Sequence, residues 1–209
     1  MLGSISIEQL IIVIGVLLVS MSVHEAMHAY MGLHLGDDTA AEQGRVSLNP
    51  LKHIDPFMTV LLPAITLFLF QAPILAAKPV PFNPERVKYG ELGAAMIAAA
   101  GPVANLVLAI LAVILARSTG VEVLVANDLF SVILYTFIVL NVSLFVFNLI
   151  PIPPLDGSRV LYAFAPEPLQ NVMRQIEPYG FFIIIGLVVV GGFGHVITGL
   201  TQSVLNFLL

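Results

Sequence analysis

Long uncharged stretches separated by short charged ones dominate this sequence. Five runs contain no Asp, Glu, Lys or Arg: 9–23, 56–77, 92–116, 129–155 and 178–209. A helix that crosses the hydrocarbon core of a bilayer needs about 20 predominantly apolar residues, so each run is a candidate for a span. The pattern therefore predicts a polytopic membrane protein.

The positions of Lys and Arg decide how the second run is interpreted, because short cytoplasmic loops collect positive charge. Suppose that residues 57–77 enter the membrane and return to the same side. Segments 34–90 and 151–178 then share one face, with seven of the eight positive charges, and only Arg117 lies on the other. A single crossing by 57–77 would largely remove this bias, and that fifth full span is the alternative.

The second run also contains residues that favour a re-entrant element. Pro63 weakens a helix there, and further prolines force the way back to be extended: Pro73, Pro79, Pro81 and Pro84. Extended, non-helical backbone is stable at membrane depth only where protein covers it or where it lines a water-filled cavity. We expect an all-α polytopic fold with a re-entrant helix and extended hairpin, and about four transmembrane helices near 8–32, 91–116, 129–150 and 180–206.

Composition narrows the classes of function. The chain is 58% hydrophobic and 10% charged with a mean hydropathy of +1.00, whereas soluble domains carry about 25% charged residues. The net charge of -5, without a basic cluster, argues against nucleic acid as a partner. There is no cysteine, so any metal must be held by His, Asp or Glu. Without repeats or a long linker, 1–209 is expected to form one intramembrane domain.

The end of the first run contains candidate metal chemistry. His24-Glu25-Ala26-Met27-His28 is an H-E-x-x-H pattern, and residues at i and i+4 project from one face of a helix. Two such imidazoles suit a tetrahedral zinc ion. Glu25 lies about 100° around the helix, near enough to a metal-bound water to be a general base. The alternative is that both histidines are merely solvated at the interface where the span ends.

A catalytic zinc site needs a third protein ligand and one open position. His34 follows His24 at the spacing of H-E-x-x-H-x-x-G-x-x-H, but Met31 stands where that pattern has glycine. If the helix continues, His34 lies about 240° beyond His28 and points away from the metal. His34 is therefore the weaker of two candidates.

The stronger candidate for the third ligand is Asp156, the only carboxylate in an otherwise uncharged stretch from Leu129 to Ser158. The preceding prolines stop helical hydrogen bonding, and Gly157 permits a close backbone approach. An unwound segment could thus bring Asp156 to a metal between helices. The alternative is that Asp156 only caps the N-terminus of a helix.

Together, these elements resemble the site-2 protease family of intramembrane zinc metalloproteases. The family's marks are H-E-x-x-H in one transmembrane helix and N-x-x-P-x-P-x-L-D-G in a later one. This sequence matches every fixed position: His24, Glu25, His28, Asn148, Pro151, Pro153, Leu155, Asp156 and Gly157. Gly101-Pro102-Val103-Ala104-Asn105 is similar to the family's G-P-x-x-N element. The resemblance covers about residues 15–165 and suggests a short form without a PDZ or regulatory domain.

The resemblance implies a single intramembrane metalloprotease domain with a core at about 8–165. Its activity would be regulated intramembrane proteolysis, the cleavage of transmembrane segments of other proteins in the lipid bilayer. Zn²⁺ would be held by His24, His28 and Asp156, with Glu25 as general base. A multi-pass protein of a bacterial or archaeal cell membrane is expected, and a homo-oligomer is compatible with the sequence. The competing function is zinc binding or transport, which would need several weak sites rather than one.

Two asparagines and one proline-rich segment are further candidates for substrate contact. Asn148 and Asn105 are polar groups in apolar surroundings that could bind the substrate carbonyl or the oxyanion. Hydrogen bonding between helices is the alternative for both asparagines. The proline-rich stretch 78–84 could offer an edge to which an extended substrate adds as a strand, or it could be a rigid loop.

Overall fold

The computed structural model describes residues 6–53, 81, 83, 85–125, 128–190 and 192–209, and the regular elements in these ranges are helical. Short 3-10 turns are η1 (Pro50–Lys52), η3 (Val123–Val125) and η4 (Glu177–Tyr179). The α-helices are α1 (Ile7–His34), α2 (Thr39–Glu42), α4 (Glu91–Thr119), α5 (Leu129–Asn148), α6 (Asp156–Phe164), α7 (Glu167–Ile176), α8 (Gly180–Val190) and α9 (Phe193–Leu208). The predicted all-α polytopic class is confirmed.

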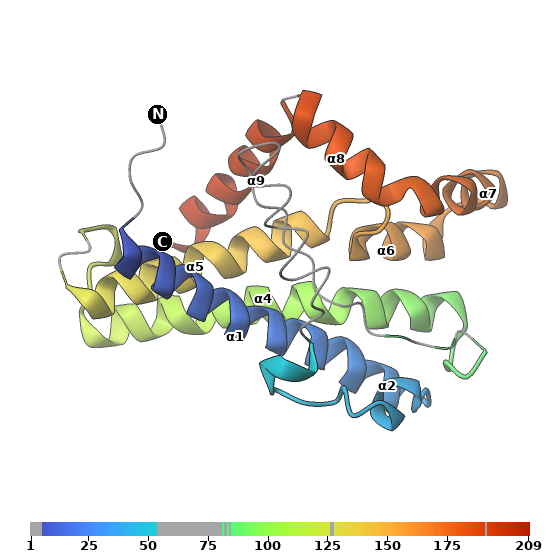
Figure 1. Ribbon diagram of the computed structural model, residues 1–209, viewed down its shortest axis with the longest axis horizontal. Coiled ribbons are helices and arrows are strands. Elements are labelled where there is room, and N and C mark those ends of the chain that lie inside the picture. Colours follow the sequence, from blue (N-terminus) through green and yellow to red (C-terminus); the bar gives the residue numbers. More distant parts are fainter. Residues whose placement is uncertain (1–5, 54–80, 82, 84, 126–127, 191) are drawn as a thin grey trace.

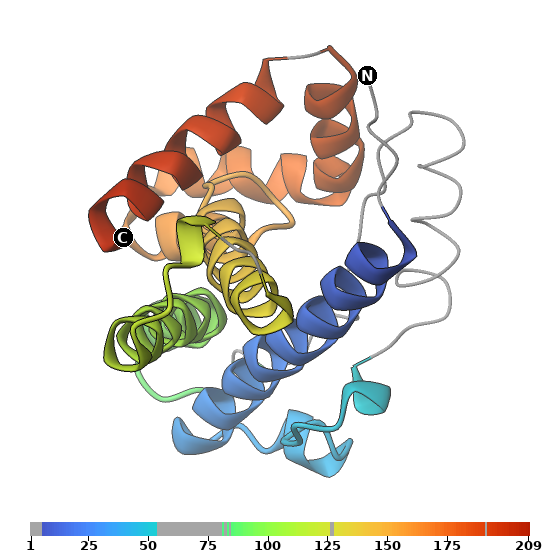
Figure 2. The ribbon, with the colours of Figure 1, turned by 90° about the vertical axis from the view of Figure 1, so that its left-hand side faces the viewer.

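Within the described residues, three helices are long and apolar enough to cross a membrane, namely α1, α4 and α5. They match the spans predicted near 8–32, 91–116 and 129–150. The three lie side by side, with α4 antiparallel to the other two (Figure 1). Viewed from the end of the bundle, α9 lies on the far side of α5 from α1 (Figure 2). Buried apolar side chains join α4, α5 and α9, among them Ala109, Val113, Ile138, Val142 and Leu205.

Two of the spanning helices begin at side-chain caps. Ser6 and Gln9 form a reciprocal capping box at the start of α1, each accepting a hydrogen bond from the other's backbone N–H. The carboxylate of Asp128 accepts from the backbone N–H of Ser131 at the start of α5. These caps satisfy N–H groups that no helical carbonyl can reach.

The span expected near 180–206 is present as a bent pair of helices, α8 and α9. The helical stretch Glu167–Val188, which includes most of α8, is bent by 87° relative to Phe193–Leu208, so the two count as a fourth span only if they are taken as one bent unit. Gly192 has a φ of 88° directly before α9, a backbone conformation that costs little only for glycine. Hydropathy alone cannot reveal such a bend, because both halves are apolar.

The end of α1 and the start of α4 are tied together. The backbone N–H of Lys88 donates to the carbonyl of Leu35 at 2.9 Å. Asp37, which is 1% exposed, accepts hydrogen bonds from Thr39 and from the backbone N–H of Asn83. Burial acts to raise the pKa of Asp37, but these hydrogen bonds outweigh it and hold that pKa below its ordinary value.

This tie bears on the membrane topology. Since Leu35 and Lys88 meet, the chain leaves α1 and enters α4 at the same end of the bundle. The predicted re-entrant hairpin at 57–77 falls outside the residues that the structure describes, as does most of the predicted edge segment 78–84. The positions of the described flanks are those that the re-entrant prediction requires.

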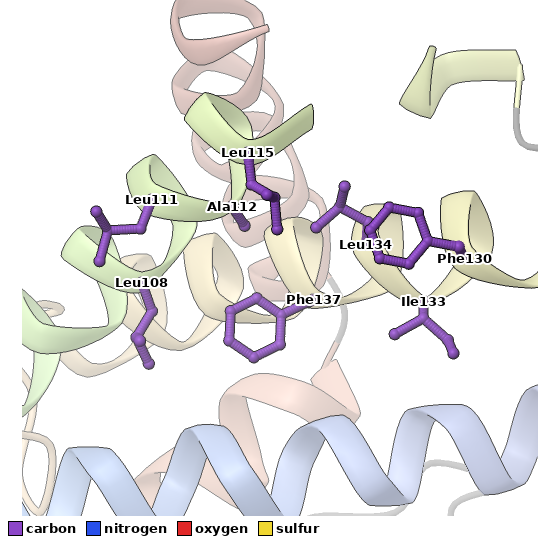
Figure 3. A pocket seen from close by; sticks show the side chains of 8 residues that line it. All are labelled: Leu108, Leu111, Ala112, Leu115, Phe130, Ile133, Leu134 and Phe137. Atoms are coloured by element: carbon purple, nitrogen blue, oxygen red, sulfur yellow. The ribbon is translucent and has the colours of Figure 1, made fainter. Parts of the chain in front are cut away.

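An open apolar cavity of about 320 Å³ lies between α4 and α5 (Figure 3). Its lining consists of hydrocarbon side chains from both helices: Leu108, Leu111, Ala112, Leu115, Phe130, Ile133, Leu134 and Phe137. Such a lining offers no group that binds a metal ion or transfers a proton. Candidate chemistry therefore lies elsewhere in the bundle.

Candidate metal centre

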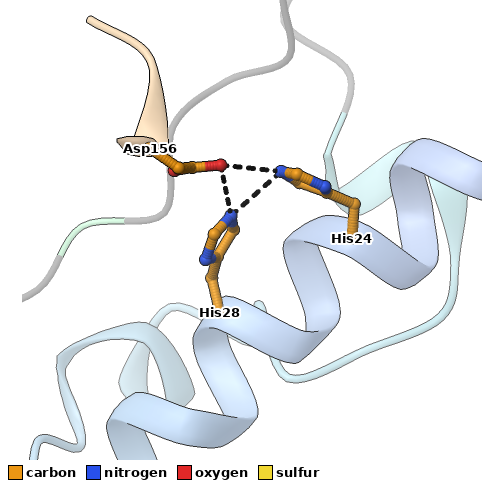
Figure 4. A group of neighbouring side chains, drawn as sticks. All are labelled: His24, His28 and Asp156. Carbon is orange, nitrogen blue, oxygen red and sulfur yellow. Dashed lines mark hydrogen bonds and ion pairs between the residues drawn. The ribbon is translucent and has the colours of Figure 1, made fainter. Parts of the chain in front are cut away.

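The structure brings His24, His28 and Asp156 together (Figure 4). The Oδ2 atom of Asp156 lies 3.2 Å from Nε2 of His24 and 3.3 Å from Nε2 of His28. The two Nε2 atoms are 3.0 Å apart. Zinc bonds of about 2.0–2.1 Å in a tetrahedral shell separate neighbouring ligand atoms by about 3.3 Å. The triangle of ligand atoms therefore has the size that a tetrahedral zinc ion requires.

Asp156 reaches the histidines because α5 ends at Asn148 and α6 begins at Asp156 itself. The proline-containing connection lets the chain turn between these two helices. Gly157 then packs directly on the end of α5, where a Cβ atom would lie only 2.2 Å from the carbonyl oxygen of Leu149. The glycine after the aspartate is thus required for the close approach that its position in the sequence predicts.

Each imidazole is oriented by a partner on α4. Nδ1–H of His28 donates to the backbone carbonyl of Ile97 at 2.7 Å, and Nδ1–H of His24 donates to Oδ1 of Asn105 at 2.6 Å. With the proton on Nδ1, the lone pair of each Nε2 atom faces Asp156. With both histidines neutral and protonated on Nδ1, the three converging atoms are all acceptors, and a positive charge between them would relieve their mutual repulsion.

The burial of the group differs from one side to the other. The side chain of Asp156 is 22% exposed, whereas those of the two histidines are 8% exposed. Catalytic metal sites need one position open to water or substrate. In this arrangement the access lies on the side of Asp156, because α4 covers the histidines.

Glu25 is buried in the same turn of α1, with 7% of its surface exposed. Its carboxylate lies within electrostatic range of His24, His28 and Asp156. A carboxylate beside a metal site and not among the ligand atoms has the position that a general base needs. The role of Glu25 in proton transfer stays a prediction.

The other candidates from the sequence lie in different surroundings. His34 is exposed and stacks on Tyr30, away from the cluster. Asn148 is partly buried, and its Nδ2 donates to the carbonyl of Leu144 in its own helix at 3.0 Å. Asn105 is fully buried behind His24, with its amide bonded to protein groups on both sides. The substrate roles of Asn148 and Asn105 stay predictions.

Sequence reasoning assigned no role at this site to Gly101, which packs against both imidazoles. A Cβ atom on Gly101 would lie 2.3 Å from Nε2 of His28 and 2.7 Å from Nε2 of His24. The glycine of the G-P-x-x-N element is thus the signal that could have revealed this contact. It lets α4 approach the ligand atoms at their metal-binding edge.

Replacing Gly101 with alanine is expected to lower zinc affinity at least tenfold, since its methyl group would push the ligand nitrogens apart, a displacement at least as damaging as the loss of an outer-shell partner. The measurement is chelator competition on the purified protein. Gly15→Ala in α1 is the matched control, because a Cβ atom there meets nothing within 4 Å. Equal zinc affinity in both variants would contradict the prediction.

The fold and the site together define a polytopic membrane protein with a cluster of three side chains that could hold a metal ion, and comparison with known proteins agrees. The model of peptidase family M50 matches residues 118–191, a segment that includes Asp156. "Putative zinc metalloprotease YwhC" of Bacillus subtilis is 40% identical over 181 residues, which cover 83% of this chain and 78% of that protein. "Putative zinc metalloprotease Rip2" of Mycolicibacterium smegmatis is 30% identical over 185 residues, covering 86% of this chain and 67% of Rip2.

The chain belongs to peptidase family M50, the site-2 protease family. The predicted resemblance is confirmed, and with it, at the level of the family, a metalloprotease with zinc as its cofactor. No solved structure matches the chain significantly.

Proposed function

We propose that this chain is an intramembrane zinc endopeptidase that cleaves transmembrane segments of other membrane proteins. The observation that carries the proposal is the convergence of three acceptor atoms, from His24, His28 and Asp156, in a triangle of 3.0–3.3 Å. In the described part of the chain this is the one group of three such residues that could hold a metal ion. A transport pathway with several weak sites has no comparable support.

The chemistry follows from the groups around the cluster. When bound, zinc would lower the pKa of a coordinated water molecule and polarise the scissile carbonyl. Glu25 takes the proton of the attacking water and delivers it to the nitrogen of the leaving amine, so that the peptide bond breaks without forming an amide anion. Asn148, at the end of α5, is proposed to stabilise the oxyanion by hydrogen bonding.

The depth of the site supports cleavage within the membrane. His24 lies about 15 Å before the end of α1 at His34, measured along the helix. A substrate must therefore bring its scissile bond below the surface of the bilayer, near the end of its own span. Because a helical backbone hides its carbonyls, the substrate has to be unwound locally before Glu25 can act.

The distribution of charge supports a cytoplasmic location for the end of the bundle nearest the site. Arg117 contacts the carbonyl of Leu208 at the opposite end. The other basic residues that the structure describes lie between α1 and α4 (Arg45, Lys52, Arg86 and Lys88), in α6 (Arg159) and in α7 (Arg174). By the positive-inside rule this face is cytoplasmic. With relatives in Bacillus and Mycolicibacterium, we propose a bacterial cell membrane.

The test is cleavage by the purified chain in liposomes that contain single-span membrane proteins. We expect fragments whose new ends map within or at the edge of the span, loss of cleavage when a chelator removes the metal, and recovery when Zn²⁺ is restored. A soluble protein of similar size is the control substrate. If no panel member is cut and Zn²⁺ instead crosses the liposome membrane, the transport alternative replaces the proposal.

A further inference from the structure

We propose that Asn141 of α5 positions the zinc ligand His24. It does so by fixing which groups donate and which accept in a series of buried hydrogen bonds that ends at His24. This inference rests on the proposed zinc site and concerns a residue outside it. Asn141 does not touch the ligand atoms. It acts through Asn105, and so it is a positioning residue.

The chain of hydrogen bonds runs from α1 through α4 to α5. Nδ1–H of His24 donates to Oδ1 of Asn105 at 2.6 Å, and Nδ2 of Asn105 donates to Oδ1 of Asn141 at 2.9 Å. Nδ2 of Asn141 in turn donates to the backbone carbonyl of Phe137 and to the hydroxyl of Ser20, both at 2.9 Å. From His24 to Asn105 and from Asn105 to Asn141 each donor thus points toward α5, and the last amide, that of Asn141, donates within α5 to Phe137 and back to Ser20 of α1.

Backbone carbonyls determine that direction, because they can only accept hydrogen bonds. If the amide of Asn141 were turned over, its oxygen would face the carbonyl oxygen of Phe137. With Asn141 held in place, turning over Asn105 would bring its oxygen against Oδ1 of Asn141 and toward the carbonyl of Ser20, which now accepts from Nδ2 of Asn105 at 3.3 Å. The carbonyl of Phe137 therefore fixes the orientation of the Asn141 amide. Asn141, together with the carbonyl of Ser20, then fixes the orientation of the Asn105 amide.

The direction matters for metal binding because it decides which nitrogen of His24 carries the proton. With Oδ1 of Asn105 facing it, Nδ1 is protonated and the lone pair of Nε2 is free. With the amide reversed, Nδ1 would accept, and the neutral imidazole would carry its proton on Nε2. That proton would occupy the position of the metal.

The two ligands on α1 are fixed in different ways. His28 donates directly to the carbonyl of Ile97, which cannot reverse. His24 depends on two side-chain amides that could each rotate. Ser20, Asn105 and Asn141 are all fully buried at 0% exposure, so water cannot replace a missing partner, and a polar group left unpaired there is strongly disfavoured.

The first experiment measures zinc affinity by chelator competition on full-length protein in lipid. Asn141→Leu removes the acceptor for Asn105 at similar volume and is expected to weaken zinc binding 10- to 100-fold, the usual effect of losing an outer-shell partner. Asn141→Asp keeps an acceptor oxygen and should retain more of the affinity. Ser143→Ala is the matched control on α5, because its hydroxyl bonds only to Val139 of its own helix. Unchanged affinity in folded Asn141→Leu, or equal losses in both Asn141 variants, would overturn the proposal.

A second measurement holds even if Asn141→Leu does not fold. In wild-type protein labelled with ¹⁵N-histidine and stripped of metal, the imidazole nitrogen shifts report the tautomer of each ring, with the signals of His24 assigned by their loss in His24→Gln. We expect Nδ1–H for His24. The Nε2–H tautomer would contradict the proposal.

Failure of the proposed zinc site gives a different result from failure of this inference. If His28→Ala binds zinc as tightly as the wild-type chain, the metal is not held where we propose. If His28→Ala loses zinc and Asn141→Leu does not, the zinc site stands and the role of Asn141 is excluded.

Discussion

Replacing Glu25 with glutamine is expected to lower kcat for cleavage by about 10²- to 10⁴-fold, the range that a positioned general base contributes. Glutamine has nearly the same shape but cannot accept the proton of the attacking water. Because Glu25 is not among the three converging ligand atoms, zinc binding should persist. The measurements are single-turnover cleavage of a membrane substrate in liposomes and zinc content per chain.

The paired readouts make this experiment specific. Retained zinc with lost cleavage assigns Glu25 to proton transfer rather than to metal binding. Loss of both would place the carboxylate among the ligands. Cleavage at the wild-type rate would remove Glu25 from the mechanism and leave the water to be activated by another group.

Replacing Asp156 with alanine is expected to reduce zinc affinity more than about 100-fold, beyond the loss that outer-shell partners produce. In the proposed site, Asp156 supplies the third ligand atom and the only negative charge in the triangle. The two remaining imidazoles, one helical turn apart, cannot form a catalytic three-ligand shell. Zinc content after dialysis and chelator competition measure the change.

His34→Ala is the control for Asp156→Ala, because His34 was the competing third ligand in the sequence. His34 is exposed and stacked on Tyr30, so its replacement should leave zinc content unchanged. Zinc lost from His34→Ala and kept by Asp156→Ala would reverse the assignment and require the chain beyond α1 to rearrange.

The spans were predictable because their signal is local. Length and apolarity define α1, α4 and α5 almost to their ends, and these properties need no knowledge of neighbours. The bend before α9 was not predictable, since the apolar run continues through it. Helices that are hydrophobic on all sides also give no amphipathic stripe, so the sequence does not show which faces meet.

For the candidate site too, the sequence predicted what depends on local spacing and not what depends on how the helices pack. His24 and His28 share a helix face by spacing alone. The preference for Asp156 over His34 rested on the prolines before Asp156, on Gly157 and on the helical position of His34, and the family resemblance then implied the same ligand. The G-P-x-x-N element marked Gly101 as a residue of interest, but its distance to the two imidazoles depends on how α4 crosses α1 and needed the structure. Asn141 stood in the sequence as one of two asparagines in an apolar run, the other being Asn148, with nothing to indicate its partner.

The bond between Arg117 and the last carbonyls of α9 has a practical consequence. It holds Leu209 beside the end of α4 that is remote from the metal-binding cluster. In the proposed topology, a fluorophore or affinity handle attached at Leu209 would lie on the opposite face of the bilayer from the basic residues near the cluster. Reporters attached there could be used to follow the enzyme in a living cell, because they would lie far from the cluster and would not block substrate binding.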